Sequence, residues 1–519
     1  MAMKRFKNII LLIFLVQLSG CSKFLDVKPA GKLIPEKGDV ASYEKLLNND
    51  YTLTGGFRSD ANGFCRLNYL TDDIEISNNQ ADYFWISSSP AMDLYYAYVY
   101  KIPYYSPTEP DLYIWWMDFY RAIEYFNVCI DGINSVRTEE EKQLANETIA
   151  QAKVARAYLF FNLALIYGPV YDPNGTNDFR TIPMRTQSDV MAPMEDLSTN
   201  GEIFSQVLKD IHSSLKVIPE EVASPSRFGK GAALAFLANY HLFTQKYDSV
   251  ALYANQALTL AATQKGGIDN LFYDYNKFTW ADAGVVTDPN KKNASTINTS
   301  QGSDALTANY NREMLLYRKC ANPPGSSYAY PSQSFQNLFN IGQDLRRDFF
   351  FFEYNGYKTI QAGVTYDDGR KVLNYQSKMA RTSGFSYPEL LLIRAEGRAR
   401  TNDLAGAIAD LNLLRKFRMK PGFTPFASTS QDAVIEEVLN ERRRELPVGS
   451  QKRFLDLKRL VLEKGKPWAK ESITHVVKGT TYTANVNSDY FRMPIQNDVI
   501  IKNPHWGLEV ETRPWSSSK

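Results

Sequence analysis

Residues 387–418 read YPELLLIRAEGRARTNDLAGAIADLNLLRKFR, which is typical of a helix, a tight turn and a second helix. Residues 231–262 follow the same pattern. A shift of 157 residues aligns Ala238 with Ala395, Tyr247 with Leu404, Ala251 with Ile408, Ala254 with Leu411 and Asn255 with Asn412. Helical hairpins of roughly 34 residues are the unit of tetratricopeptide-like repeats. Small residues on both helices favour a close crossing, so the sequence predicts a mainly α fold built from hairpins.

Further helices are predicted on both sides of these hairpins. Apolar residues recur at three- and four-residue steps in 39–49, 112–133, 147–167, 202–217, 431–445 and 453–462. Asp39 is the expected N-cap of the first of these helices, and Ser386 with Glu389 forms a capping box before residue 390. Gly168-Pro169 is a helix stop. The helical hairpins are therefore expected at about 112–167, 202–262 and 387–462.

Two stretches between the hairpins, 51–111 and 266–385, are predicted to be loop-rich, and the tail from Pro467 is predicted to be non-helical. Gly, Pro, Asn and Ser punctuate the two stretches, and many aromatic side chains lie in them. The whole chain has 32 Tyr, 29 Phe and 7 Trp. Long irregular segments inside a compact protein are usually functional or disordered, and the aromatic content argues against disorder.

The N-terminus has the pattern of a secretory leader. Lys4, Arg5 and Lys7 precede the apolar run from Ile9 to Val16, which as a helix rises only about 12 Å, too short for a bilayer of about 30 Å. Leu18-Ser19-Gly20-Cys21 then resembles the lipobox of bacterial lipoproteins. That resemblance implies a signal peptide at 1–20, a lipidated Cys21 with a tether to residue 38, and one domain over 39–519.

Charge and cysteine content exclude several classes of protein. The chain has 59 basic and 57 acidic side chains, a net charge of +2, and loss of the leader's three bases leaves −1. A near-neutral chain without a basic run gives no electrostatic case for nucleic-acid binding. Cys65, Cys129 and Cys320 are odd in number and widely spaced, so buried thiols are favoured over a single disulfide.

The sequence gives little indication of an enzyme. His212, His241, His475 and His505 lie far apart without metal-ligand spacing, and GxSxG, P-loop and GxGxxG motifs are absent from the printed sequence. The adjacent pairs Asp72/Asp73 and Asp367/Asp368 are more typical of turns or caps than of facing glycosidase carboxyls. Alternating charges over 441–445 indicate ion pairs within the protein. We therefore expect no catalysis, no metal and no cofactor.

Several segments, in order along nearly the whole chain, resemble the RagB/SusD family. They are Cys-Ser-Lys-Phe-Leu-Asp at 21–26, Ala-Lys-Val-Ala-Arg-Ala-Tyr-Leu-Phe-Phe at 152–161, Lys-Gly-Ala-Ala-Leu-Ala at 230–235, Pro-Glu-Leu-Leu-Leu-Ile-Arg-Ala-Glu at 388–396, Glu-Arg-Arg-Arg-Glu-Leu at 441–446, Arg-Phe-Leu-Asp-Leu-Lys-Arg at 453–459, Arg-Met-Pro-Ile at 492–495 and Asn-Pro at 503–504.

The resemblance implies a fold and a role. Members of this family are surface lipoproteins that help Bacteroidetes outer membranes import nutrients. The expected fold has tetratricopeptide-like hairpins on one side and a loop-rich irregular subregion on the other. The expected partner is a TonB-dependent, SusC-like outer-membrane transporter, over which the lipoprotein acts as a lid. The expected ligand is an oligosaccharide, with peptide capture as the alternative.

The aromatic loops are where we expect a sugar to bind. The apolar face of a pyranose stacks on Trp or Tyr, and its hydroxyls pair with planar polar groups. We expect Trp85 and Trp280 to be the platforms, with Tyr83, Tyr96 and Tyr273 beside them and Asn68 and Asp72 as polar partners. Alternatives are a peptide ligand, a lipid-anchored glycosidase, or a helical scaffold in which these aromatics are buried.

Overall fold

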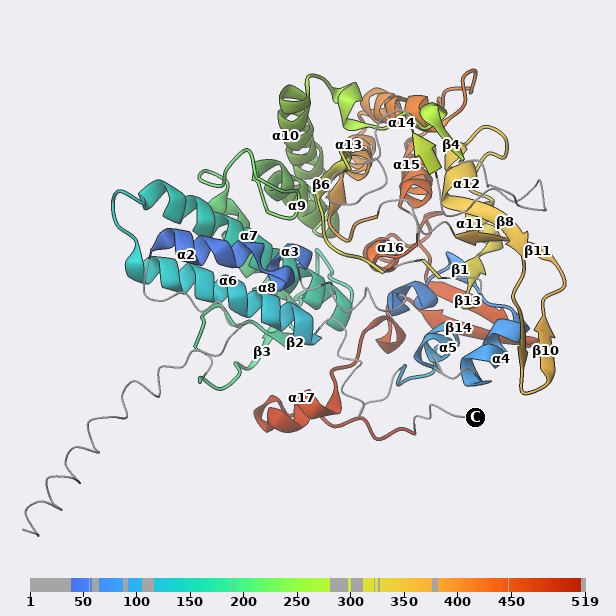
Figure 1. Ribbon diagram of the computed structural model, residues 1–519, viewed down its shortest axis with the longest axis horizontal. Helices are drawn as coiled ribbons and strands as arrows, with labels where there is room; N and C mark the ends of the chain where they lie inside the picture. The colour runs from blue at the N-terminus through green and yellow to red at the C-terminus, as the bar shows by residue number, and fades with distance from the viewer. Residues whose placement is uncertain are drawn as a thin grey trace, which may run out of the picture.

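The computed structural model is described here for residues 39–55, 57, 65–86, 92–104, 116–189, 191–280, 297–299, 311–321, 323–324, 327–375, 381–446 and 448–514. The expected leader, the expected lipidation site Cys21 and the expected tether lie outside these residues. Within them the fold is mainly α-helical, as the sequence predicts, with helices on one side and a mixed region of short elements on the other (Figure 1).

The helical side is a series of antiparallel helices that pack on their neighbours along the chain (Figure 1). The long members are α6 Trp116–Val136, α7 Lys142–Tyr167, α8 Asn200–Ser214, α9 Lys230–Phe243, α10 Tyr247–Lys265, α13 Tyr387–Arg400, α14 Leu404–Arg418, α15 Gln431–Glu445 and α16 Lys452–Leu460; the short ones are α2 Val40–Glu44, η2 Lys45–Asn48 and α3 Asp50–Thr54. Asp39 caps α2 through the Ser42 amide, as predicted.

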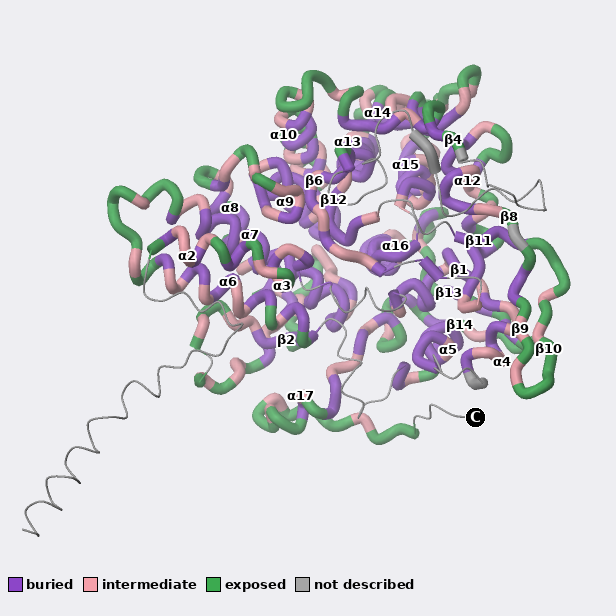
Figure 2. The backbone as a smooth tube through the Cα atoms, in the orientation of Figure 1, coloured by how far each residue is buried: buried purple, intermediate pink, exposed green. Residues whose placement is uncertain are grey.

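Helix α7 is the centre of the helical side. It packs between α6 and α8, and almost every side chain from Thr148 onward is buried (Figure 2). Among the described helices α7 alone is long and apolar enough to cross a membrane, but 89% of that window is buried inside the protein. A helix that is apolar on all faces is typical of the middle of a core, and α7 ends at Gly168, where the sequence predicts a stop.

The internal repeat is confirmed. The shift of 157 residues carries the bounds of α9 onto those of α13, and the start of α10 onto the start of α14. At the contact of α10 with α13, a Cβ added to Gly397 would lie 2.7 Å from the Ala251 backbone nitrogen. The hairpins therefore pack through a crossing that only glycine allows.

The second side holds short helices and two-stranded sheets rather than bare loops. Its elements are η4 Arg66–Leu70, β1 Ile74–Glu75, α4 Asn78–Ile86, α5 Met92–Tyr98, η6 Ile268–Leu271, η7 Tyr275–Lys277, β4 Phe278–Trp280, β5 Ile297–Thr299, β6 Met314–Leu316, β7 Tyr330–Pro331, α11 Gln333–Gln336, α12 Leu345–Phe350, β8 Phe351–Asn355, β9 Lys358–Gln361, β10 Val364–Asp367, β11 Lys371–Tyr375 and β12 Phe385–Ser386. These strands pair antiparallel as β1–β7, β4–β5, β6–β12, β8–β11 and β9–β10. A further antiparallel hairpin, β2 Arg180–Pro183 with β3 Leu197–Thr199, packs on α7 instead.

The prediction of few helices over 51–111 is therefore wrong for the described part of that stretch, which includes α4 and α5. Helix α5 is buried on nearly all sides, so its tyrosines do not produce the one-sided apolar period from which surface helices are recognised. The prediction for the tail is also wrong. It forms the hairpin of β13 Ser472–Val477 and β14 Thr480–Asn485, then η9 Asp489–Phe491, α17 Asn497–Lys502 and η10 Pro504–Trp506.

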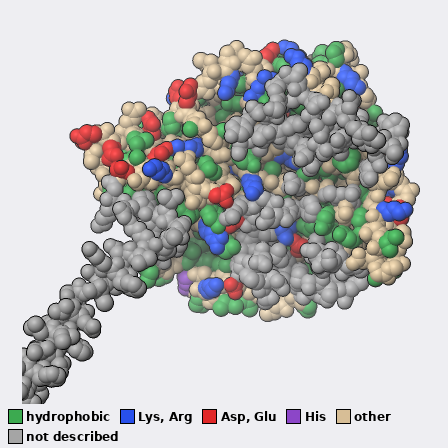
Figure 3. Space-filling model, in the orientation of Figure 1, with side chains coloured by type: hydrophobic (Ala, Val, Ile, Leu, Met, Phe, Trp, Pro, Cys, Tyr) green, Lys and Arg blue, Asp and Glu red, His purple; other side chains and the backbone are tan. Residues whose placement is uncertain are grey.

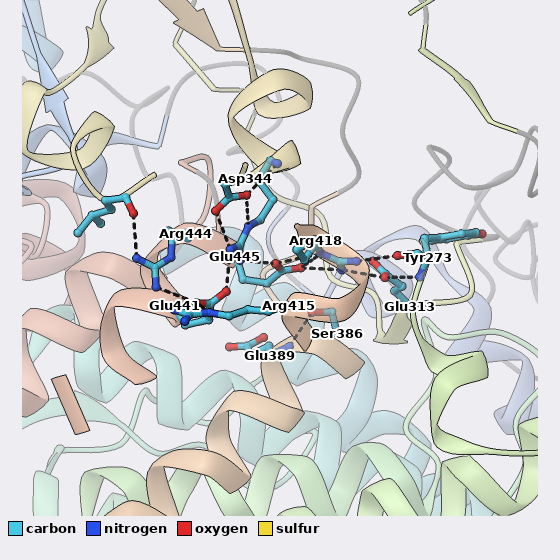
Figure 4. Close-up of polar contacts among 12 residues, drawn as sticks. Tyr273, Glu313, Asp344, Ser386, Glu389, Arg415, Arg418, Glu441, Arg444 and Glu445 are labelled. Carbon is cyan, nitrogen blue, oxygen red and sulfur yellow. Dashed lines mark hydrogen bonds and ion pairs between the residues drawn. The ribbon is translucent and has the colours of Figure 1, made fainter. Parts of the chain in front are cut away.

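A buried network of charges joins the two sides (Figure 4). Glu441 on α15 is fully buried and accepts hydrogen bonds from Arg346 of α12 at 2.7 Å, Arg415 of α14 at 2.7 Å and Arg444 at 2.7 Å. Glu445 likewise accepts from Arg418 at 2.8 Å. The predicted ion pairs are thus present, but most of them connect different elements rather than neighbours on one helix.

The same segment continues into a second network. Ser386 caps α13 through the Glu389 amide, but the Glu389 carboxylate does not complete the predicted capping box. It is 1% exposed and instead accepts hydrogen bonds from Arg442 and from Lys452. A buried carboxylate requires such partners. Glu389 therefore belongs both to the start of α13, through its amide, and to the ion network, through its carboxylate.

Candidate functional site

The two tryptophans predicted as platforms are placed by their backbones only. Trp85 lies in α4 and Trp280 in β4, and the side chains of both lie outside the described residues. Strand β4 lies beside α12 and α14, whereas α4 lies beside α5 and the β9–β10 hairpin, at the other end of the mixed side (Figure 1). The two predicted aromatic loops therefore do not meet in one site.

Three of the predicted contact residues are buried and have internal partners. Tyr96 is 2% exposed with the Lys101 ammonium 4.2 Å from its ring centre, and Tyr273 is 3% exposed beneath the Arg312 guanidinium at 4.2 Å. Asn68 donates to the Ser450 carbonyl at 2.8 Å and accepts from the Gly449 amide at 3.1 Å. These side chains hold the core together, and their faces are not open to a ligand.

Asp72 anchors the N-terminal part of the mixed side to α16 and α15. Its two carboxylate oxygens accept from Arg453 at 2.8 and 2.9 Å, and Arg443 lies 3.2 Å away. Burial alone would raise the pKa of Asp72, but the charges of Arg453 and Arg443 outweigh it and hold that pKa well below its usual range. Asp72 is thus a permanently charged structural partner.

Tyr83 is the predicted contact residue that lies in a partly open aromatic cluster. Its half-buried ring lies 5.1 Å from that of Tyr357 and, edge to face, 6.1 Å from that of Tyr328. Phe84 packs behind Tyr328 at 5.9 Å. We call Tyr83, Phe84, Tyr328 and Tyr357 the Tyr83 cluster. Offset and edge-to-face contacts of this kind hold rings in fixed orientations, which a stacking platform requires.

Polar side chains fix α4 to the strands beside this cluster. Asp368 accepts from Asn79 of α4 at 2.7 Å and from the Tyr330 hydroxyl at 2.5 Å, and that hydroxyl accepts from the Tyr357 amide. Asn78, at the start of α4, accepts from the Lys478 amide at 2.7 Å. Amide and carboxylate groups therefore hold α4 to the segments next to the cluster.

The phenols of Tyr328, Tyr357 and Tyr330 stay neutral at physiological pH. Burial raises the pKa of Tyr328 and of Tyr357, and burial together with the hydrogen bond to Asp368 raises that of Tyr330. Neutral phenols can donate and accept hydrogen bonds. The cluster thus combines apolar faces with neutral hydroxyl groups, a combination suited to an uncharged polar ligand.

The partners of Tyr83 were missed by sequence reasoning. Tyr328 and Tyr330 lie in the aromatic part of 266–385, and Tyr357 and Asp368 flank the β9–β10 hairpin. Their types were visible in the sequence, but their meeting with residue 83 depends on tertiary contacts. Figure 2 shows that the hairpin itself is largely exposed.

The coloured part of the face drawn in Figure 3 has no large patch of a single charge. On the face drawn in Figure 3, the coloured acidic and basic side chains are interspersed. Among the residues that the structure describes, no group of three His, Cys, Asp or Glu side chains is arranged to hold a metal ion. Cys65 and Cys129 are buried thiols, as predicted, whereas the Cys320 thiol is half-buried.

Two family models and several solved structures match the chain. A family model described as "Starch-binding associating with outer membrane" matches residues 23–242, and the SusD family model matches residues 268–506. No curated protein matches the chain. Solved structures match over nearly their whole length.

One of these structures is a SusD-like carbohydrate binding protein from Bacteroides vulgatus, with 17% identity, a TM-score of 0.55 and coverage of 90% of this chain and 97% of that one. Another is a SusD superfamily protein from Bacteroides thetaiotaomicron, with 16% identity, a TM-score of 0.61 and coverage of 90% and 98%. A third, from Parabacteroides distasonis, has 17% identity, a TM-score of 0.56 and coverage of 89% and 97%.

At these identities the structures establish the shared fold, and the two family models together span most of the sequence. Both agree with the helical hairpins and the mixed side described above. The chain therefore belongs to the RagB/SusD family, whose members are outer-membrane-associated binding proteins for nutrient uptake.

Proposed function

We propose that this protein captures oligosaccharide at the Tyr83 cluster and delivers it to a SusC-like, TonB-dependent transporter. Family membership supports the class of function, and the partly open Tyr83 ring with its fixed neighbours is the observation that carries the site. Trp85 also lies on α4, two residues further along and therefore not on the same helix face as Tyr83, and we propose it as a second, separate stacking surface. Trp280 is proposed only as a separate contact, since β4 lies at the other end of the mixed side.

Binding without catalysis is part of the proposal. A sugar ring stacked on Tyr83 would have the amide of Asn79 and the carboxylate of Asp368 nearby, and both are already held by hydrogen bonds. Polar groups that are oriented before binding lose little freedom when a ligand arrives. The Asn79 amide and the Asp368 carboxylate can fix the orientation of a sugar. Cleavage of a glycoside needs two carboxyl groups on either side of the glycosidic bond.

The cellular setting of the proposal follows from the N-terminus. Lipidation at Cys21 would hold the domain on the outer membrane, where several acyl chains give stable anchoring. A surface position would let the domain meet its ligand before the transporter does. Retention of a SusC-like barrel on the lipidated protein during purification from outer membranes tests this partner.

Affinity electrophoresis of residues 22–519 in native gels that contain single polysaccharides tests ligand capture. We expect one glycan to retard the wild type, and Tyr83→Ala and Trp85→Ala to remove most of the retardation. Tyr253→Ala is the matched control, because Tyr253 is also half-buried but lies on α10 beside His241. Trp280→Ala reports on the second proposed contact.

The other outcomes separate the alternatives. Retardation that survives Tyr83→Ala and Trp85→Ala would leave glycan capture standing and exclude this site. No retardation by any glycan would contradict the proposed ligand, and a peptide-mixture pull-down would then test peptide capture. Release of reducing sugar by the purified protein would contradict the proposal of binding without catalysis.

A further inference from the structure

A second cavity lies away from the Tyr83 cluster, between the end of α7, α16 and the segment around η9. Its volume is about 220 Å³, and its lining includes Pro169, Phe179, Lys458, Ser488 and Arg492. A larger cavity of about 510 Å³ adjoins it and shares Phe179, Asp489 and Arg492. The smaller space has room for about one sugar unit, and the larger one falls in the usual range for small ligands.

Lys458 places a buried amine in the wall of the smaller cavity. Its side chain comes from α16, is 1% exposed, and donates to the carbonyls of Leu165 at 2.6 Å and Gly168 at 2.7 Å. No carboxylate pairs with it among the described residues. Carbonyls at the C-terminus of a helix attract a cation but carry only partial charge, so the charge of Lys458 is only partly compensated.

Arg492 adds a second positive charge at the same wall. Its guanidinium lies 4.7 Å from the ring centre of Phe179 and pairs with Asp489. Burial first, and then the nearby charge of Arg492, lower the pKa of Lys458 well below its usual range. Bound negative charge at this wall would oppose both effects and favour the charged form of the Lys458 amine.

Phe179 supplies an apolar surface beside these charges. It is 44% exposed, which is unusual for a phenylalanine, and it directly precedes β2. A partly exposed ring next to an anion-attracting wall matches a ligand that carries both an apolar face and a carboxylate. A pyranose with a carboxylate in place of its terminal hydroxymethyl group has both features.

We propose that this cavity binds a uronate sugar, with its carboxylate directed to Lys458 and Arg492 and its ring on Phe179. The site is separate from the Tyr83 cluster, because β2 lies against the helical side whereas α4 lies at the far edge of the mixed side (Figure 1). The proposal therefore does not depend on the platform proposed above.

Isothermal titration of residues 22–519 with galacturonate and glucuronate tests this inference, with galactose and glucose as neutral counterparts. We expect at least one uronate to bind about tenfold more tightly than its neutral counterpart, since a hydrogen bond to a charged group adds that much. Arg492→Gln and Phe179→Ala should each weaken binding by about tenfold. Both side chains are partly exposed, so both variants should fold, and unfolding temperatures check this.

Two control variants distinguish binding in this cavity from a general charge effect and from binding at the Tyr83 cluster. Arg137→Gln removes an exposed arginine on the helical side and should leave uronate binding unchanged. Tyr83→Ala should also leave it unchanged, even if that variant loses glycan capture. Equal binding of acidic and neutral sugars, no heat with either uronate, or loss of uronate binding in Tyr83→Ala would each overturn the proposal.

Discussion

Glu441→Gln is expected to destabilise the protein strongly, although it changes few atoms. One Glu441 oxygen accepts from Arg346 at 2.7 Å, and the other accepts from Arg415 at 2.7 and 2.8 Å and from Arg444 at 2.7 Å. In glutamine the second position would be an NH₂ donor facing two guanidiniums. Breaking a buried ion pair from one side costs about 3–5 kcal/mol.

The corresponding change in unfolding temperature follows from the size of the domain. An entropy of unfolding of about 2.1 cal/mol/K per residue gives about 1 kcal/mol/K for a domain of this length. Glu441→Gln should therefore lower the unfolding temperature by about 3–5 °C in differential scanning calorimetry. Glu140→Gln is the matched control. It makes the same chemical change at an exposed position before α7, and its effect should stay below about 1 °C.

The effect should also depend on pH with a definite sign. Burial opposes the charge of Glu441, but the three guanidiniums outweigh it and hold the pKa well below its usual value of 4.5. A carboxylate with a lowered pKa contributes its full stability above the unfolded pKa and loses it as pH falls further. The advantage of wild type over Glu441→Gln should be constant above about pH 5 and shrink below it. A shift under 1 °C at pH 7 would refute the reasoning.

Three further perturbations test the packing and the electrostatics. Gly397→Ala should lower the free energy of unfolding in denaturant by about 1–3 kcal/mol, because the added methyl group would overpack against α10. Gly201→Ala is the control and should be neutral or stabilising, because the nearest neighbours of its added Cβ would lie 3.5 Å away. Equal effects of the two variants would contradict the close crossing. Burial lowers the pKa of His241 from 6.5 to about 4. The free energy of unfolding should therefore fall by up to about 3 kcal/mol as the pH drops from 6.5 to 4, and His241→Gln should abolish that loss. Arg453→Met should speed tryptic cleavage within 51–111 by releasing Asp72, and an unchanged cleavage rate would contradict that anchor.

Much of the helical side could be predicted because its signals are local. Apolar period, caps and stops are set by residues within one or two turns of each other, so α15 was placed at 431–445 and the end of α7 at Gly168. The repeat was visible because one hairpin shape imposes one pattern of small and apolar residues at both copies. The order of segments in the chain was also enough to indicate the family.

The mixed side was predicted less well because its helices are buried on several faces. In α5 nearly every residue is buried, so apolar and polar positions do not alternate with a helical period. Tyr96 and Tyr83 have the same residue type and a similar neighbourhood in sequence, yet Tyr96 is buried in the core and Tyr83 is half-buried. Only the tertiary packing of α5 and α4 distinguishes them.

By itself, the sequence determined the fold class, the helical hairpins and the family, since each depends on short-range chemistry or on the order of segments. Tertiary structure decided which aromatics are open, which carboxylates are neutralised, and which distant residues meet. Tyr83 reaches Tyr357, and Arg346 reaches Glu441, only after the chain has closed long loops. The geometry of a binding site is of this second kind, because it depends on contacts between segments that the sequence keeps far apart.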